Sequence, residues 1–126
     1  MKLSTMMIIN AVVAAFFGVA FVLVPSQAIS LYGVEDASEI LILILRLMAA
    51  AFIGFAVLTW LARNASDSDA RRAIVLALIV SDGIGFIAAL MAQLADVVNS
   101  LGWSTVAIYL FLAIGWGYFQ FVKQEP

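Results

Sequence analysis

The sequence predicts an all-α membrane protein, a four-helix antiparallel transmembrane bundle with both termini in the cytoplasm. Three observations lead to this fold class. Of the 126 residues, 66% are hydrophobic and 11% are charged, whereas soluble domains carry about 45–50% apolar and about 25% charged residues. Four apolar runs each reach the roughly 20 residues that a helix needs to cross a bilayer. Lysine and arginine gather on alternate connections between these runs, which sets the orientation.

The four predicted spans occupy most of the chain and leave no room for a soluble domain, so we expect a single transmembrane domain over residues 1–126. The first apolar run is about 20 residues long, which exceeds the roughly 7–15 residues of a signal-peptide core. We therefore expect a membrane span there rather than a cleaved leader. The predicted spans are residues 5–24, 40–62, 73–94 and 101–122.

Residues that start or stop helices mark the connections. Pro25 cannot continue the first helix, and residues 26–32 then read as one or two amphipathic turns that Gly33 ends. Residues 36–39 offer an aspartate N-cap, Asp36, with a glutamate three positions later for the second helix. Residues 66–69 offer the same chemistry for the third. Because the polar turn before the third helix is short, the second and third helices should be antiparallel neighbours.

The distribution of basic residues predicts the sidedness of the bundle. Cytoplasmic loops of membrane proteins carry an excess of lysine and arginine. Five basic residues fall on the side of the two termini. On the opposite side, the charged residues outside the spans are all acidic. Trp60, Trp116 and Tyr118 fall near the same interface, where aromatic side chains anchor helices. The basic residues are Lys2, Arg63, Arg71, Arg72 and Lys123; the acidic ones are Glu35, Asp36, Glu39 and Asp96.

Several function classes are excluded by composition. The chain has no cysteine and no histidine, which removes disulfides, thiol redox chemistry, haem and iron–sulfur ligation, and histidine-dependent nucleophilic catalysis. A net charge of −2 with six basic residues gives no electrostatic footprint for a nucleic acid. We expect no cofactor, no metal and no catalytic residue; the expected partners are the lipid bilayer and other copies of the chain or a larger membrane complex.

Arg46 and Asp82 are the two ionisable side chains inside the predicted spans. A charge at the bilayer centre costs about 2.5–3.5 kcal/mol on insertion scales, so such residues face the protein interior and find partners. Helical rise separates the two in depth by roughly 9 Å, which the side chains or a bridging water could span. We expect one polar cluster between the second and third helices, extended outward by Gln93 and Glu39. It is either a structural ion pair or an ion- or proton-coupled site in an outward-opening cleft.

Small residues recur four positions apart in every predicted span, and such spacing lets membrane helices approach closely. The fourth span, where Gly115 and Gly117 flank Trp116, is the candidate face for self-association. Asn10 and Gln120 lie at the same end of their helices and could pair with each other. The small-residue pairs are Ala14 and Gly18, Ala50 and Gly54, Gly85 and Ala89, and Ala113 and Gly117.

Two known families share this size and span count but not the residues. Small multidrug-resistance transporters carry a glutamate in the first span, which has no carboxylate here, and dual-topology fluoride channels need an even spread of lysine and arginine. One resemblance is carried by Pro25 and residues 31–33 (LYG), 45–50 (LRLMAA), 60–63 (WLAR) and 101–103 (LGW). On these residues the chain resembles small uncharacterised bacterial four-span membrane proteins, grouped as domains of unknown function. That resemblance implies a bacterial inner (plasma) membrane location and supplies no activity.

The favoured function is an accessory or interaction subunit that acts through helix packing. The alternative is a small transporter or ligand-binding membrane protein with a polar cleft around Arg46 and Asp82. An enzyme ranks third, because one arginine and one aspartate are too few groups for an aqueous substrate.

Overall fold

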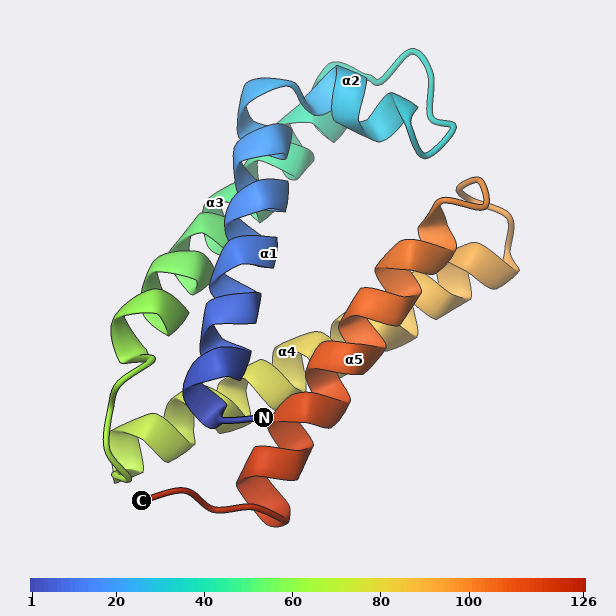
Figure 1. Ribbon diagram of the computed structural model, residues 1–126. Helices are drawn as coiled ribbons and strands as arrows, with labels where there is room; N and C mark the ends of the chain where they lie inside the picture. Colours follow the sequence, from blue (N-terminus) through green and yellow to red (C-terminus); the bar gives the residue numbers. More distant parts are fainter. The chain divides into compact units, whose positions relative to one another are not determined.

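The computed structural model describes residues 1–126 and is helical throughout, with no strand. Four of its five helices are long and apolar enough to cross a membrane, so the all-α class with four candidate membrane spans is confirmed. The largest difference is at α4, which begins at Asp69 rather than at residue 73. The helices are α1 (Leu3–Leu23), α2 (Pro25–Ser30), α3 (Glu39–Ala62), α4 (Asp69–Leu94) and α5 (Gly102–Phe121) (Figure 1).

Two compact units make up the chain. One comprises residues 7–63, with α2, α3 and most of α1; the other comprises residues 1–6 and 64–126, with α4 and α5. The boundary between them falls inside α1, after its first turn. Each unit has its own packing.

In the unit of residues 7–63, α1 and α3 pack as antiparallel neighbours. Gly18 lets the helices approach closely, since a Cβ atom there would lie 3.2 Å from the Ala49 carbonyl oxygen and 3.2 Å from the Ile53 nitrogen. Nearer the other end of the pair, Asn10 donates a hydrogen bond of 3.3 Å to the Thr59 hydroxyl. Both polar residues are buried, so this bond satisfies an amide and a hydroxyl that hydrocarbon could not.

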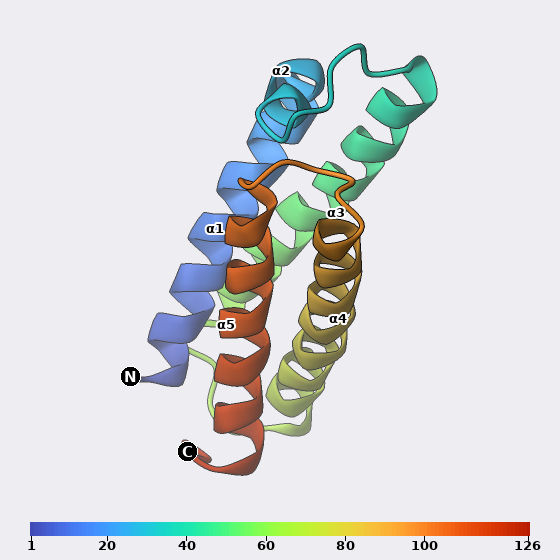
Figure 2. The same cartoon turned by 90° about the vertical axis from the view of Figure 1, so that its right-hand side faces the viewer.

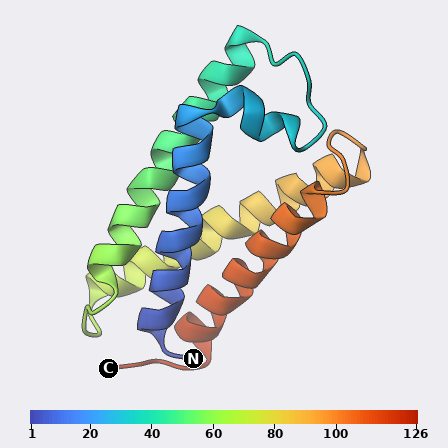
Figure 3. The same cartoon turned by 45° about the horizontal axis from the view of Figure 1, so that its top comes forward.

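The far end of the same unit is closed by α2. Pro25 takes the first turn of this short helix, where its missing N–H is no loss. Figure 3 shows α2 turning away from the end of α1. A core of Phe21, Leu45 and Ala49 joins α1 to α3, and Ala28 of α2 packs against it; further partly buried members are Phe17, Val22, Ile29, Tyr32, Leu41 and Met48. The amphipathic turns predicted after Pro25 are therefore a helix, and Gly33 ends it with a left-handed φ of 89°.

In the unit of residues 1–6 and 64–126, α4 and α5 run side by side along their length, as Figures 1 and 2 show. Gly85 gives room to the ring of Tyr109, whose Cδ1 would lie 2.6 Å from a Cβ atom on the glycine. Gly115 similarly gives room to Met6, whose sulfur would lie 2.9 Å away. Two of the predicted small residues thus serve packing within this unit.

Serine side chains cap the second and third spans. Ser38 accepts a hydrogen bond of 3.2 Å from the Leu41 nitrogen, and Ser68 accepts one of 3.1 Å from the Arg71 nitrogen. The predicted aspartate cap of the second span, Asp36, is wrong. Its φ of 54° is left-handed, which places it in the preceding turn, and the helix starts two residues after the predicted cap requires.

The C-terminus of α4 depends on a left-handed aspartate. Asp96 has a φ of 55°, and around it the Val97 nitrogen donates to the Ala92 carbonyl at 3.0 Å. This bond closes the last turn in the manner of a Schellman cap, whose left-handed position glycine usually fills. Aspartate tolerates that conformation better than most side chains, but at a steric cost that glycine avoids.

Substitution of Asp96 tests this cap. We expect Asp96→Gly to raise the unfolding free energy by a few tenths of a kcal/mol to about 1 kcal/mol, because glycine adopts the left-handed conformation without strain. Asp96→Val should lower it by about 1–2 kcal/mol. Thermal unfolding of the two variants in detergent, followed by circular dichroism, measures the difference. An equal effect of glycine and valine would contradict the role of the left-handed turn.

Candidate functional site

The strongest polar contact inside the spans joins α4 to α5. Trp116 donates a hydrogen bond of 2.9 Å from its indole nitrogen to Oδ2 of Asp82. The Trp116 side chain is fully buried, and Asp82 is 7% exposed. Asp82 lies in the middle of α4, so the bond gives a carboxyl group at mid-membrane depth a donor from the neighbouring helix. An interhelical bond at this depth holds the rotation of both helices.

Gln93 lies on the same face of α4 as Asp82, near the C-terminal end of that helix. Its Nε2 donates a hydrogen bond of 3.2 Å to the Asn99 carbonyl in the connection to α5. Its Oε1 is buried without a hydrogen-bond partner and occupies the space that a Cβ atom on Gly102 would need. Gly102 is therefore required at the start of α5, because any side chain would displace the glutamine amide.

Arg46 bonds to the end of α1 within its own unit. Its Nε donates a hydrogen bond of 3.2 Å to the Val22 carbonyl oxygen. Val22 is the penultimate residue of α1, and carbonyls in the last turn of a helix lack partners of their own. The positive guanidinium also suits the negative end of the helix dipole. The Arg46 side chain is exposed, as is Glu39 at the start of α3.

The four residues of the predicted cluster thus have different neighbours. Asp82 and Gln93 share the face of α4 that packs against α5, whereas Arg46 and Glu39 lie on α3 in the other unit. No carboxylate of the unit of residues 7–63 forms an ion pair with Arg46. A single cluster that joins Arg46 to Asp82 stays a prediction.

A second polar site, which the sequence did not single out, lies at the start of α4. Arg71 is 7% exposed and donates hydrogen bonds to the Ala65 carbonyl at 3.0 Å, to the Pro126 carbonyl at 3.4 Å and to the Glu125 carbonyl. It also pairs with Asp67 at 3.6 Å. One buried guanidinium therefore ties the turn before α4 to residues 125–126. In the sequence Arg71 is one of two adjacent arginines beside a turn, which gives no signal of this role.

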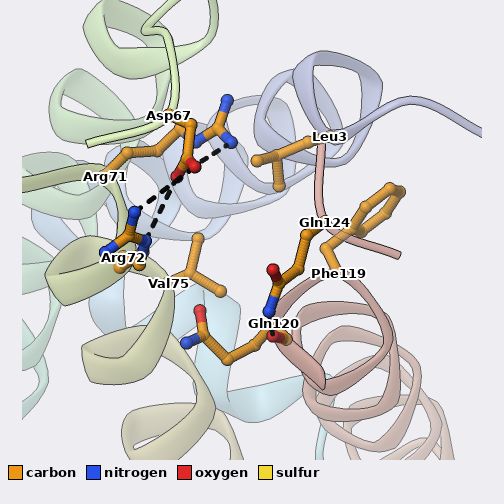
Figure 4. A pocket seen from close by; sticks show the side chains of 8 residues that line it. All are labelled: Leu3, Asp67, Arg71, Arg72, Val75, Phe119, Gln120 and Gln124. Atoms are coloured by element: carbon orange, nitrogen blue, oxygen red, sulfur yellow. Dashed lines mark hydrogen bonds and ion pairs between the residues drawn. The ribbon is translucent and has the colours of Figure 1, made fainter. Parts of the chain in front are cut away.

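Asp67 holds both arginines at this end of α4 (Figure 4). Arg72 donates to it from Nε at 3.2 Å and from Nη2 at 3.3 Å, a two-pronged contact. This hydrogen bonding from Arg72 holds the pKa of the Asp67 carboxyl below its ordinary value. The carboxylate therefore keeps its charge, and its ion pairs, until the solution becomes more acidic than a free aspartate would need.

The arginines border a cavity of about 30 Å³, which Figure 4 shows together with the side chains around it. Leu3, Val75 and Phe119 supply its apolar wall, and Gln120 and Gln124 add amide groups. A water molecule takes up about 30 Å³ of the liquid, and small-molecule sites span about 300–1,000 Å³. The cavity has room for water rather than for a metabolite.

Two predicted roles of polar and aromatic residues are wrong. Trp116 was expected to be an interfacial anchor, but it is fully buried and bonds to Asp82. Asn10 could pair with Gln120 by its place in the sequence, but it donates to Thr59, whose hydroxyl in turn donates to the Phe55 carbonyl at 2.8 Å. In both cases the partner depends on the rotation of a helix about its axis, which hydropathy alone does not specify.

Comparison with known families decides what this chain is related to. A family described as a domain of unknown function, DUF8292, matches residues 1–122. The chain belongs to the DUF8292 family. No curated protein and no solved structure matches it.

The polar side chains of this DUF8292 protein form hydrogen bonds within the protein itself. Asp82 bonds to α5, Arg46 bonds to the end of α1, and Arg71 bonds to residues 125–126. No group of three or more aspartate or glutamate side chains lies close enough together to hold a metal ion. These polar contacts fix the orientation of the helices. The Asp82 carboxyl group can accept a hydrogen bond from Trp116 or from another donor in its place.

A double-mutant cycle tests the Asp82–Trp116 bond. We expect Trp116→Phe to destabilise the wild-type protein more than it destabilises the Asp82→Leu variant, because only the wild type loses the bond. The coupling free energy should be about 0.6–1.7 kcal/mol, from the average to the maximum measured for hydrogen bonds between membrane helices. Unfolding of the four proteins in mixed micelles gives this energy. A coupling near zero would contradict a stabilising bond.

Proposed function

We propose that this DUF8292 protein is an accessory subunit that packs α3 against a transmembrane helix of another membrane protein. The observation that carries the proposal is a stripe of exposed residues along α3 with small side chains at its centre. Ala50 and Gly54 are both exposed, and a Cβ atom on Gly54 would meet nothing within 4 Å. The stripe consists of Ile40, Leu43, Leu47, Ala50, Gly54, Val57 and Leu61.

The spacing of the stripe supports helix packing over contact with lipid alone. Its members alternate three and four positions apart, the repeat that keeps one helix face toward a partner helix. Small residues at the centre of such a face let two backbones approach closely, which drives association where lipid is as apolar as leucine. In contrast, Gly18, Gly85 and Gly115 already accommodate neighbours within their own units. Gly54 is open to a partner.

The intramembrane polar groups support the same proposal. Asp82 is buried and bonds to Trp116, so it already has a structural role. The alternative, a transporter or ligand-binding protein with a polar cleft around Arg46 and Asp82, requires these residues to line a water-filled space. The two proposals differ in what accompanies the protein when it is purified from its native membrane.

A matched pair of glycine variants tests the packing face. A Cβ atom on Gly54 of α3 or on Gly83 of α4 would meet nothing within 4 Å, so both leucine variants should fold. We expect the wild type and Gly83→Leu to purify from the native membrane with a partner in fixed stoichiometry, and Gly54→Leu to purify alone. Native gels and quantitative mass spectrometry measure the ratio. A homogeneous protein with a co-purified small molecule would instead favour the alternative.

We also propose that both termini face the cytoplasm and that the membrane is a bacterial inner membrane. The support is the placement of basic residues: Lys2 precedes α1, Arg63 follows α3, and Lys123 follows α5, whereas residues 24–38 and 95–101 contain none. Cytoplasmic connections retain such residues during insertion.

Reporter fusions test the orientation. A reporter attached after Pro126 should give a cytoplasmic signal, and one inserted in the connection between α2 and α3 should give a periplasmic signal, because basic residues lie only at the first of these sites. Activity of paired alkaline phosphatase and fluorescent fusions measures both positions. A periplasmic signal after Pro126 would overturn the orientation.

A further inference from the structure

Arg46 combines a fixed position with unused hydrogen-bonding capacity. Its bond to the Val22 carbonyl, at 3.2 Å, uses the N–H of Nε. A guanidinium has five N–H donors, and the other four lie on its two Nη atoms. The side chain is exposed, and its neighbours Leu43 and Leu47 are 51% and 63% exposed. Arg46 thus presents a charged fork beside exposed apolar side chains at one end of the α3 stripe.

The depth of Arg46 places this fork within reach of lipid headgroups. The 24 residues of α3 span about 36 Å by helical rise, against about 30 Å of hydrocarbon. Arg46 follows the first residue of α3, Glu39, by seven positions, or about 10 Å. Its Cα then lies about 7 Å inside the hydrocarbon boundary, a depth that long arginine side chains cross by extending toward the interface. The bond to Val22, near the end of α1, directs the guanidinium that way.

We propose that Arg46 binds the phosphate of a zwitterionic, amine-bearing phospholipid in the leaflet at the α2 end of the spans. Arginine binds phosphate through two parallel N–H groups, and the Nη1–Nη2 edge supplies them while Nε holds Val22. The lipid's acyl chains lie against the exposed side chains of Leu43 and Leu47, at the end of the α3 stripe away from Gly54. The lipid and the partner helix proposed for α3 share this stripe: the lipid takes its end at Leu43 and Leu47, and the helix takes the part around Ala50 and Gly54.

The charges beyond Arg46 select the headgroup. From Arg46 back toward the start of α3 and into the connection before it, the charged residues are Glu39, Asp36 and Glu35. No basic residue occurs between Lys2 and Arg46. Along α3 the order from the membrane outward is therefore cation, then anions. A phosphate with an ammonium group beyond it has the complementary order. An anionic headgroup without an amine would place its outer oxygens against the carboxylates.

Native mass spectrometry of the purified full chain tests the site. The probes are phosphatidylethanolamine, phosphatidylglycerol and inorganic phosphate, each titrated into delipidated protein in detergent. We expect one phosphatidylethanolamine to bind more tightly than phosphatidylglycerol, and Arg46→Gln to weaken it by about tenfold, the effect of one lost charge-assisted contact. Glu39→Gln should reduce the preference for phosphatidylethanolamine while keeping phosphate-dependent binding.

Arg63→Gln is the matched control, because it removes one charge from the opposite end of α3. Arg63 contacts Trp60, its guanidinium carbon lying 4.0 Å from the ring centre, and its loss should leave lipid binding unchanged. Arg46→Lys keeps the charge without the two-pronged edge and should weaken binding about threefold or more. If Arg46→Gln fails to fold, the lipid affinity of Arg46→Lys tests the proposal in its place.

Three results would overturn the proposal. Equal lipid binding by the wild type and by folded Arg46→Gln or Arg46→Lys would remove Arg46 from the site. Displacement of the lipid by millimolar inorganic phosphate would assign the site to free phosphate instead. Co-purification of a partner protein with the wild type but not with folded Arg46→Gln, with no lipid bound, would assign the fork to a protein partner.

Discussion

Inside a bilayer no water satisfies polar groups, so every amide, hydroxyl and charge that enters the spans must find its partner in protein or at the interface. Three side-chain bonds meet that requirement here. Asn10 bonds to Thr59, Arg46 to the Val22 carbonyl, and Trp116 to Asp82. Each bond crosses between two helices of the same unit. The polar residues of this apolar chain therefore determine which helix faces pair.

Glycines allow the close helix packing that accompanies these hydrogen bonds. Gly18 brings α1 against the backbone of α3, and Gly85 accepts the Tyr109 ring of α5. Close approach and hydrogen bonding support each other, because a bond of about 3 Å between side chains requires backbones that are near. Helix pairs joined in this way leave other faces unpaired within their own unit. Gly54 lies on such a face.

The sequence predicted the features that depend on composition and local order. Hydropathy located the four spans, and Pro25 and Gly33 located the short helix between the first two. It did not predict the features that depend on helix rotation. Trp116 has the residue type and the position of an interfacial anchor. It differs from one because its indole points toward Asp82 of α4 rather than toward the interface. Asp36 could cap a helix as well as Ser38, and the left-handed backbone of the preceding turn decided between them. The role of Arg71 depends on residues 125–126, far away in sequence.

The Asp82–Trp116 bond has a consequence for how the chain is made. The two residues are 34 positions apart, so α4 leaves the ribosome and meets the translocon before its partner exists. During that interval Asp82 adds its full transfer cost, about 2.5–3.5 kcal/mol, to a helix that is otherwise strongly apolar. The connection between α4 and α5 is short, residues 95–101. Lateral release of the two as one preformed hairpin removes this barrier, since the indole then reaches the carboxyl group before either helix meets lipid alone.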